Sequence, residues 1–265
     1  MTVVTTVQPD VGVLVREWRM RRRLSQLELG LRADVSAKHV SFVETGRARP
    51  TRDMLLNLSE HLDIPLRERN EILLAGGFAP AYPEHAMTDI PMAAVASAIA
   101  QILQAHLPNP AVVVDRHWTM VDANPAIALL TKGCAAELLE PPINVLRLAL
   151  HPDGMAPRIA NLAQVSAHLI GRLRHQIAVT GDRTLTRLAD ELETYPAGPG
   201  HEMSHSELLV PIQIDTAAGE LNLMSTTTVF GAPRDVTVAD LAIESFYPAD
   251  EKTTDLLAQH RIDAE

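Results

Sequence analysis

The stretch LSQLELGLRADVSAKHVSFVETGRARP, residues 24–50, decides the fold of the first part of the chain. It predicts two short helices joined by a tight turn. Ser25 is placed to cap the first helix, because a serine hydroxyl accepts a hydrogen bond from a free backbone N–H at a helix start. Leu27 and Leu31 recur four residues apart and predict one apolar face. Gly30 lacks a side chain where a second helix would have to cross closely.

Residues 37–44 predict the second helix of the pair. Asp34 suits the turn before it, since Asp is among the few non-glycine residues that tolerate a left-handed backbone. Ser36 is placed to cap this helix. Val40 and Val43 are its inward-facing apolar residues, and the remaining side chains are left for other contacts.

This pattern of caps, small residue and turn resembles the XRE family of helix-turn-helix domains, over about residues 10–75. The resemblance implies that Gln26 touches a phosphate, that the start of the second helix faces base edges, and that residues just beyond it grip phosphates. It also implies that Glu44 pairs with Arg19 as scaffolding. The candidate DNA-binding residues are therefore Gln26, Ser36, Ala37, Lys38, His39, Phe42, Thr45, Arg47 and Arg49.

Two positions depart from the family pattern. Asp34 stands where a turn glycine is usual. Phe42 offers no hydrogen bond to a base, so it either contacts a thymine methyl group or packs within the protein, and both interpretations stay open.

The composition indicates a globular protein with a buried core. The chain has 265 residues, 46% of them hydrophobic and 3% aromatic, so aliphatic side chains must fill the interior. The single cysteine, Cys134, excludes a disulfide within the chain. There is no run of 18 or more apolar residues, and the first ten residues lack a basic segment followed by an apolar one. We therefore expect a soluble, cytoplasmic protein without a membrane-spanning segment.

Charge is divided unevenly along the chain, whose net charge is −10. Residues 11–52 contain ten Lys and Arg against four Asp and Glu, a balance of +6. Residues 81–265 contain eleven basic and twenty-three acidic residues, a balance of −12. Positive charge is what the phosphate backbone of DNA attracts, so the division indicates a DNA-binding head on a body that does not bind DNA. A solvated basic helix face is the alternative for residues 16–23.

Further helices are predicted around the two-helix motif. Asp10 is placed to cap a first helix, and apolar periodicity predicts two more helices after residue 50. These elements predict an all-α domain of five helices over residues 8–77. Residues 78–91, rich in Pro and Ala, are predicted to be a linker.

The second part of the chain has a different pattern. A helix is predicted over residues 92–106, and Asn124 is predicted to cap another. A long amphipathic helix is predicted over residues 158–179. Five apolar runs predict strands at residues 111–114, 118–121, 208–214, 220–230 and 241–247. We therefore expect an α+β domain over residues 92–260, with a roughly five-stranded antiparallel sheet.

Three phrases in this part carry a second resemblance: NPAVVVDRHWTMVDANPA at residues 109–126, INVLRLALHPDG at 143–154 and ADLAIESFYPADEKT at 239–253. They resemble the ligand-binding domain of MmyB-like transcription regulators, over about residues 91–260. The resemblance implies a PAS-like fold that encloses a small hydrophobic ligand, with fatty acids the class to test first. Composition and spacing alone indicate no ligand.

A cavity for an acyl chain needs an apolar lining and one or two polar groups for its head. Candidates for the lining are Trp118, Met120, Leu129, Leu130, Leu146, Leu150, Leu169, Leu173 and Leu223. Ordinary core packing is the alternative for each of them. Candidates for the polar groups are Asn124, Arg147 and His151, with Arg172 and Arg174 behind them. A helix cap, a surface ion pair and a bond to a loop carbonyl are the respective alternatives for the first three.

Signals for catalysis are weak. The chain has no G-x-S-x-G elbow, phosphate-binding P-loop or G-x-G-x-x-G. His201 and His205 lie four residues apart beside Glu202, but the preceding Pro199 and Gly200 favour a loop over the rigid helix that a metal site would need. We therefore expect no enzyme activity, no metal and no cofactor.

The sequence thus predicts a DNA-binding transcription regulator whose C-terminal domain binds a small hydrophobic ligand that modulates DNA binding. We expect it to bind double-stranded operator DNA as a homodimer, because one recognition helix reads few bases. Two alternatives remain. One is a ligand-independent DNA-binding protein whose C-terminal domain serves dimerisation or protein interaction. The other is an enzyme with an appended DNA-binding head.

Overall fold

The computed structural model describes residues 10–198 and 209–264, and the chain divides into two compact units. The N-terminal unit holds the residues up to His85 together with Ala232–Ala239. The C-terminal unit holds Ala86–Gly231 and Asp240–Glu265. The chain therefore passes between the two units three times, and a short segment from late in the sequence belongs to the N-terminal unit.

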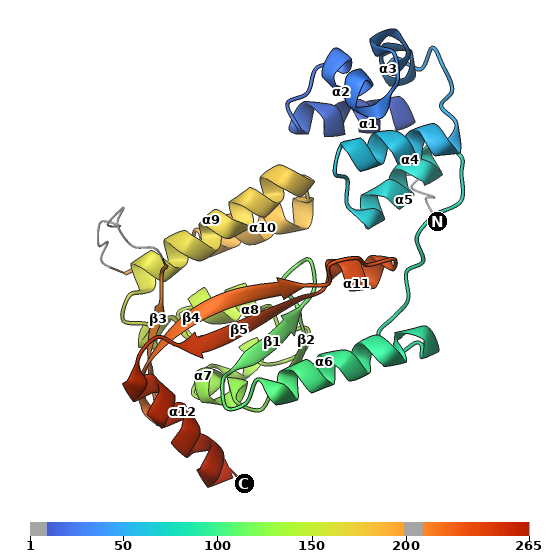
Figure 1. The fold of residues 1–265 in the computed structure, drawn as a ribbon. Helices are drawn as coiled ribbons and strands as arrows, with labels where there is room; N and C mark the ends of the chain where they lie inside the picture. The colour runs from blue at the N-terminus through green and yellow to red at the C-terminus, as the bar shows by residue number, and fades with distance from the viewer. Residues whose placement is uncertain (1–9, 199–208, 265) are drawn as a thin grey trace, which may run out of the picture. The chain divides into compact units, whose positions relative to one another are not determined.

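Five helices form most of the N-terminal unit, which confirms the predicted all-α bundle (Figure 1). They are α1 (Val11–Arg21), α2 (Gln26–Ala33), α3 (Ala37–Glu44), α4 (Arg52–His61) and α5 (Leu66–Ala75). The predicted serine caps are present: Ser25 accepts a hydrogen bond from the backbone N–H of Glu28, and Ser36 accepts one from that of His39. Glu28 completes a capping box by accepting from the backbone N–H of Ser25.

The corner between α2 and α3 has the backbone that the sequence predicts. Asp34 is left-handed, with φ 54° and ψ 44°. A Cβ atom on Gly30 would lie 2.4 Å from the carbonyl oxygen of Val35, so only glycine permits this approach of the two helices.

The apolar face predicted for α2 was wrong. Leu27 and Leu31 are 60% and 75% exposed, whereas Leu29 and Ala33 are buried. Both pairs have the same spacing of four residues, so periodicity alone does not separate them. The face that includes Gly30 is the one that approaches α3 closely, and it is therefore the face that is buried.

Residues 78–85 and the late segment complete the N-terminal unit. The side chain of Asn70 in α5 bonds the backbone of Ala81 and Tyr82. Helix α11 (Val236–Asp240) begins with Val236, which is fully buried and whose N–H donates to the carbonyl of Pro83, at 2.8 Å. Part of the segment predicted as a linker is thus packed and hydrogen-bonded.

An antiparallel sheet with the strand order β2-β1-β5-β4-β3 forms the centre of the C-terminal unit, which confirms the predicted α+β class. Two predicted strands began too early. Trp118 lies in the hairpin turn with φ 66°, and residues 209–211 precede the first paired residue of their strand. The strands are β1 (Ala111–Val114), β2 (Met120–Ala123), β3 (Ile212–Thr216), β4 (Gly219–Val229) and β5 (Ala242–Pro248).

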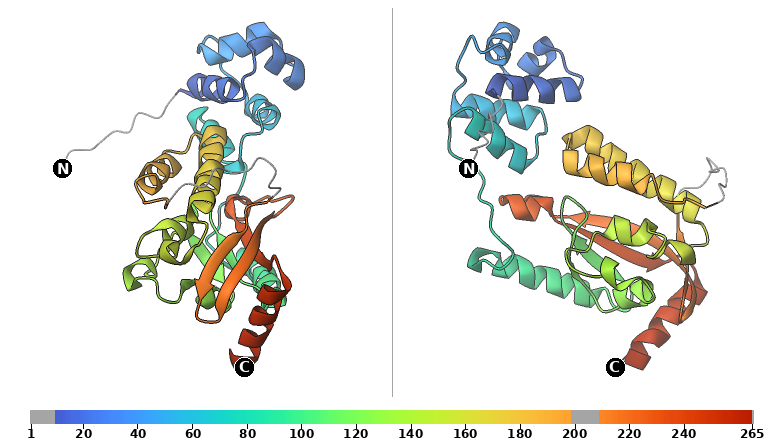
Figure 2. Two further views of the ribbon diagram at one scale, coloured as in Figure 1. Left: turned by 90° about the vertical axis from the view of Figure 1, so that its left-hand side faces the viewer. Right: turned by 180° about the vertical axis from the view of Figure 1, so that it is seen from behind.

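Helices cover both faces of this sheet, which is why all four residues of β1 are buried. Ala111 and Val113 face α6 (Ala93–Ala105), whereas Val112 and Val114 face the larger core on the other side. Figure 2 shows α6, in green, and the yellow pair α9 and α10 on opposite sides of the sheet. Helices on the larger-core side are α7 (Ile127–Thr131), α8 (Val145–Leu150), α9 (Leu162–Thr180) and α10 (Arg183–Leu192).

A last helix, which the sequence pattern did not predict, and several short turns complete the unit. Helix α12 (Glu251–Ala264) begins after Asp250, whose carboxylate accepts from the backbone N–H of Thr253, at 2.7 Å. Leu257 buries this helix against the core. Single 3₁₀ turns are η1 (Ile90–Met92), η2 (Ala136–Leu138) and η3 (Ala156–Arg158). Within the described ranges, no helix is long and apolar enough to cross a membrane.

Candidate functional site

Helix α3 displays the residues predicted to face DNA bases. Lys38 is exposed, and its Nζ lies 5.5 Å from the centre of the Phe42 ring. Ala37, His39 and Phe42 are each half-buried. The ring of Phe42 thus lies beside the lysine rather than in the core, which places an apolar and a cationic group together on one helix face.

The residues that follow α3 supply positive charge. Arg47 and Arg49 are exposed, and neither side chain has a hydrogen bond or ion pair to any residue the structure describes. Thr45 is also exposed, but its hydroxyl donates to the carbonyl of Ser41, at 2.7 Å. Both guanidinium groups are therefore available to phosphate.

Glu44 anchors the start of α2 and the end of α3 to α1. Its carboxylate accepts from Arg19 Nε at 2.6 Å and from Arg19 Nη2 at 2.9 Å, and Gln26 Nε2 donates to the same carboxylate at 2.9 Å. Burial raises the pKa of Glu44, but the bonds from Arg19 and Gln26 outweigh burial and hold that pKa below its ordinary value. Gln26, a candidate phosphate contact, is thus held by an internal bond at the helix start.

A cavity of about 90 Å³ lies in the C-terminal unit, between the sheet and the helices on its larger-core side. Its walls are almost entirely apolar, and the polar groups among them are Thr131, Arg172, Ser225 and Glu244. The apolar lining residues are Val112, Trp118, Met120, Ile127, Leu130, Val145, Leu146, Leu148, Ala149, Met155, Leu169, Ile212, Ile214, Leu223 and Phe246.

The structure brings about half of the predicted ligand residues to this cavity. The lining includes six of the apolar candidates, Trp118, Met120, Leu130, Leu146, Leu169 and Leu223. Leu150 and Leu173 are buried in the surrounding core, and Leu129 lies beside a separate surface hollow next to α12. Of the candidate polar groups, only Arg172 reaches the lining.

The other predicted polar residues have partners elsewhere. Arg147 forms a bidentate ion pair with Glu191, with Nε–Oε1 2.6 Å and Nη2–Oε2 2.7 Å. The bonds from Arg147 lower the pKa of Glu191 to about 2. The ring of His151 accepts from the backbone N–H of Asp153, at 3.0 Å, and the exposed Arg174 pairs with Glu193.

Asn124 caps no helix, because α7 begins only at residue 127. Its side chain accepts from the backbone N–H of Ala111 at 3.1 Å and donates to the carbonyls of Asn109 at 2.8 Å and Leu103 at 3.2 Å. Buried at 4% exposure, it joins the ends of α6, β1 and β2 and has no free polar atom for a ligand.

The ion pair at the cavity was missed as a pair. Arg172 Nη2 lies 2.9 Å and Nη1 3.3 Å from the carboxylate oxygens of Glu244, and the guanidinium carbon lies 4.9 Å from the centre of the Trp118 ring. The available signal was a glutamate in the largely apolar strand AIESFYP, where a buried charge requires a partner.

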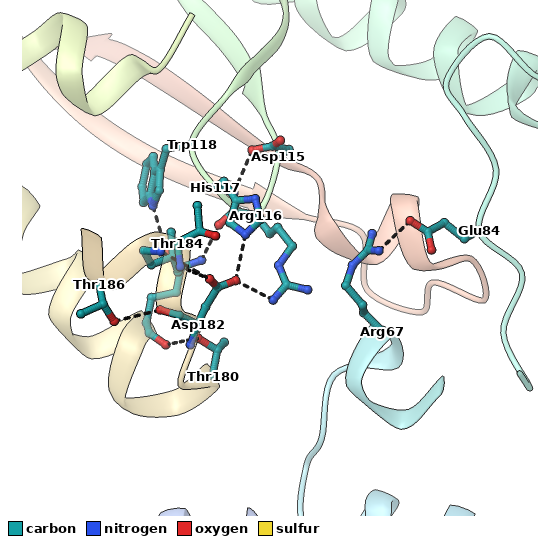
Figure 3. A network of polar contacts seen from close by, with 12 residues as sticks. Arg67, Glu84, Asp115, Arg116, His117, Trp118, Thr180, Asp182, Thr184 and Thr186 are labelled. Carbon is teal, nitrogen blue, oxygen red and sulfur yellow. Dashed lines mark hydrogen bonds and ion pairs between the residues drawn. The ribbon is translucent and has the colours of Figure 1, made fainter. Parts of the chain in front are cut away.

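A second polar cluster fastens the β1–β2 hairpin to the corner between α9 and α10 (Figure 3). The carboxylate of Asp182 accepts from Arg116 Nη2 and His117 Nε2, both at 2.8 Å, and caps α10. The side chain of Gln176 accepts from Trp118 Nε1 and donates to the carbonyl of Arg116. This cluster fixes Trp118, and with it one wall of the cavity.

Two family models match the chain. The model of the MmyB-like transcription regulator ligand binding domain matches residues 95–259, which is more than half of the chain. The chain belongs to the MmyB-like transcription regulators. A helix-turn-helix model matches residues 15–69, which include α2 and α3. This MmyB-like protein is therefore a DNA-binding transcription regulator with a ligand-binding domain, and both matched families describe binding functions.

Other comparisons add little. No curated protein matches the MmyB-like chain. One solved structure that resembles it is described as an RNA-binding Light-Oxygen-Voltage receptor, at 16% identity and a TM-score of 0.28. The alignment covers 94% of this chain and 65% of that one. The chain thus spans less than two thirds of the length of that structure.

The candidate metal residues His201 and His205 lie outside the described residues. The run HEMSH at residues 201–205 has the H-E-x-x-H spacing of zinc-binding helices.

The single cysteine, Cys134, is half-buried, and burial raises the pKa of its thiol above the ordinary value.

Proposed function

We propose that the cavity of the C-terminal unit binds a small hydrophobic ligand, with fatty acids and related acyl compounds as the class, and that its occupancy changes operator affinity. The observation that supports this proposal is the cavity itself, whose described walls are apolar except for two hydroxyl groups and one ion pair. One water molecule needs roughly 10–15 Å³ of cavity volume. A cavity of about 90 Å³ therefore has room for on the order of six to nine groups the size of a water molecule. An acyl chain of medium length suits this volume.

For DNA, we propose that residues 8–77 act as the DNA-binding domain, 78–91 as linker and 92–260 as ligand-binding domain. Lys38, His39 and Phe42 face base edges, with Ala37 between the helix cap Ser36 and Lys38. Thr45, Arg47 and Arg49 contact phosphates, as does Gln26 at the start of α2. A homodimer supplies two such helices to half-sites about one helical turn apart.

The experiment that tests the ligand proposal is native mass spectrometry of the full chain, with analysis of its solvent extract. It gives the oligomeric state and any co-purified molecule together. We expect a dimer that carries an acyl compound, or that takes up one compound from a series of fatty acids and their methyl esters with eight to sixteen carbons in the acyl chain. A protein that neither carries nor takes up any of these compounds would leave the C-terminal unit as a dimerisation module.

A matched pair of variants connects ligand uptake to the cavity. Ala149→Phe adds a large side chain at the cavity wall, whereas Ala94→Phe adds the same side chain at an exposed position of α6. We expect the first variant to lose ligand uptake and any effect of the ligand on operator binding, and the second to keep both. Equal uptake by both variants would place the ligand elsewhere.

A further inference from the structure

The cavity already contains a charge and its counter-charge. The side chain of Glu244 is 6% exposed, and its carboxylate accepts from Arg172 Nη2 at 2.9 Å and Nη1 at 3.3 Å. A third bond comes from the hydroxyl of Thr227, at 2.8 Å, and Arg172 donates to the same hydroxyl, also at 2.8 Å. The side chains of Arg172, Glu244 and Thr227 thus bond to one another and together carry no net charge.

The register of the sheet places this set at the cavity. Glu244 in β5 lies opposite Thr227 in β4 and opposite Val112 in β1. Because side chains alternate along a strand, Phe246 and Ser225 lie on the same face one step further along, and both line the cavity. Arg172 approaches this row from α9, with its guanidinium stacked on Trp118.

A ligand with an ionised carboxylate would compete with Glu244 for Arg172. Displacing Glu244 would leave a buried carboxylate without its arginine, which is strongly unfavourable. Joining Glu244 would bring two carboxylates to one guanidinium, and like charges at short range prevent both from remaining ionised. Either arrangement weakens the binding of an anionic head.

An uncharged head meets no such competition. Thr131 and Ser225 line the cavity, and the hydroxyl of Ser225 has no hydrogen-bond partner among the residues that the structure describes. A hydroxyl can donate to an ester or acid carbonyl and can accept from an alcohol or a protonated acid. The cavity therefore offers a neutral polar contact beside the closed ion pair.

We infer that Glu244 selects ligands by the charge of their polar end, so that the bound molecule carries an uncharged head: an alcohol, an ester or a protonated acid in place of a carboxylate anion. This inference rests on the proposed function, because it concerns the ligand of the same cavity. Glu244 would thus determine which polar end is accepted, a selection that the apolar lining alone does not make.

The test titrates the full-length protein at about pH 8 with 1-octanol and with octanoate, which have the same chain length. His168, four residues before Arg172 on the same helix, is neutral at this pH, because burial and then Arg172 lower its pKa. We expect 1-octanol to bind the native protein roughly tenfold or more tightly than octanoate, because only octanoate competes with Glu244 for Arg172. Glu244→Gln should raise the affinity for octanoate by a similar factor, because Arg172 then lacks its carboxylate partner. The affinity for 1-octanol should stay nearly unchanged.

Two further variants control the test. Glu191→Gln removes the carboxylate from another bidentate arginine pair, outside the cavity, and should change neither affinity. If Glu244→Gln fails to fold, the double variant Arg172→Met/Glu244→Leu removes both charges together. It should keep its affinity for 1-octanol and bind octanoate weakly.

The outcomes separate this inference from the proposed function. Octanoate that binds the native protein as tightly as 1-octanol, or an octanoate affinity that does not rise in Glu244→Gln, overturns the role of Glu244 while the cavity remains a ligand site. Absence of binding for both probes in the native protein overturns the proposed function and this inference together.

Discussion

At the scale of single residues, the N-terminal unit depends on a buried ion pair. The side chains of Arg19 and Glu44 are 11% and 1% exposed. We expect Glu44→Ala to lower the free energy of unfolding by about 3–5 kcal/mol, because it leaves a guanidinium buried without its carboxylate. Urea unfolding measures this loss. The double variant Arg19→Met/Glu44→Leu should lose much less, and a loss below about 1 kcal/mol in the single variant would contradict the expectation.

The residues proposed to contact DNA should divide into two classes. Lys38→Ala/His39→Ala should abolish the preference for the operator over unrelated DNA, because these side chains are proposed to meet base edges. Arg47→Ala should weaken binding to all DNA about equally and reduce the slope of log affinity against log salt by about one. Fluorescence anisotropy with operator and scrambled duplexes at several salt concentrations measures both effects. Native operator binding by both variants would mean that α3 is not the recognition helix.

At the scale of elements, two helical glycines differ in what surrounds them. Gly30→Ala should destabilise the N-terminal unit by about 1–3 kcal/mol, because its Cβ would lie 2.4 Å from a backbone oxygen of the α2–α3 turn. Among the described residues, nothing beyond the backbone of its own helix lies within 4 Å of the Cβ position of Gly171 in α9, so Gly171→Ala should stabilise the protein by about 0.5–1 kcal/mol. Thermal unfolding of both variants compares them. Equal effects would argue against close packing at the corner.

The Asp182 cluster should respond to acid. Burial raises the pKa of Asp182, but bonds from His117, the backbone N–H of Thr184 and Arg116 outweigh it and lower the pKa from 3.8 to about 2. The folded state therefore releases this proton more readily than the unfolded state does. The ionised carboxylate stabilises the fold by about 2 kcal/mol; this stabilisation is complete above about pH 4 and is lost as pH falls through about 2. Asp182→Asn should lose it near neutral pH, as measured by urea unfolding across pH.

Asp190→Asn provides the control for this prediction, because Asp190 is exposed on the same helix. It should leave the pH dependence of unfolding unchanged. Parallel curves for Asp182→Asn and the native protein between about pH 2 and 4 would mean that the cluster contributes nothing.

How far the sequence predicts these elements depends on the range of the interactions that form them. The helix-turn-helix was predictable because caps, turn and glycine act over a few residues, as with Ser36 and Asp34. The partners Arg172 and Glu244 lie 72 residues apart, and no local pattern joins them. The sequence pattern did not predict helices α11 and α12. Asp235 and Asp250 cap them, but each cap follows directly on a strand or loop.

At the scale of the whole molecule, the segment Ala232–Ala239 connects two strands that line the cavity with the N-terminal unit through the chain itself. It lies between β4 and β5, whose Ser225 and Glu244 line the cavity, yet it packs in the N-terminal unit. There, His85 Nδ1 lies 2.7 Å from a carboxylate oxygen of Asp235, and Thr237 donates to the carbonyl of His85 at 2.7 Å. We therefore predict that a change in the spacing of β4 and β5 on ligand binding would reach the residues that follow α5.

We expect Asp235→Ala/Thr237→Val to reduce the effect of ligand on operator affinity severalfold while operator affinity without ligand stays near the native value. The reason is that this variant loosens the segment without touching α2, α3 or the cavity lining. Operator titrations with and without ligand measure the difference. An unchanged ligand effect would exclude this segment as the coupling element.

The same segment limits how the protein can be rebuilt. A sensor chimera made by joining a foreign DNA-binding head at residue 86 would keep Val236 but remove Pro83 and His85, to which this segment is bonded. An apolar side chain that is now fully buried would then face water. A functional fusion must therefore carry residues 78–85 with the sensor, or replace residues 232–239 by a turn suited to the new head.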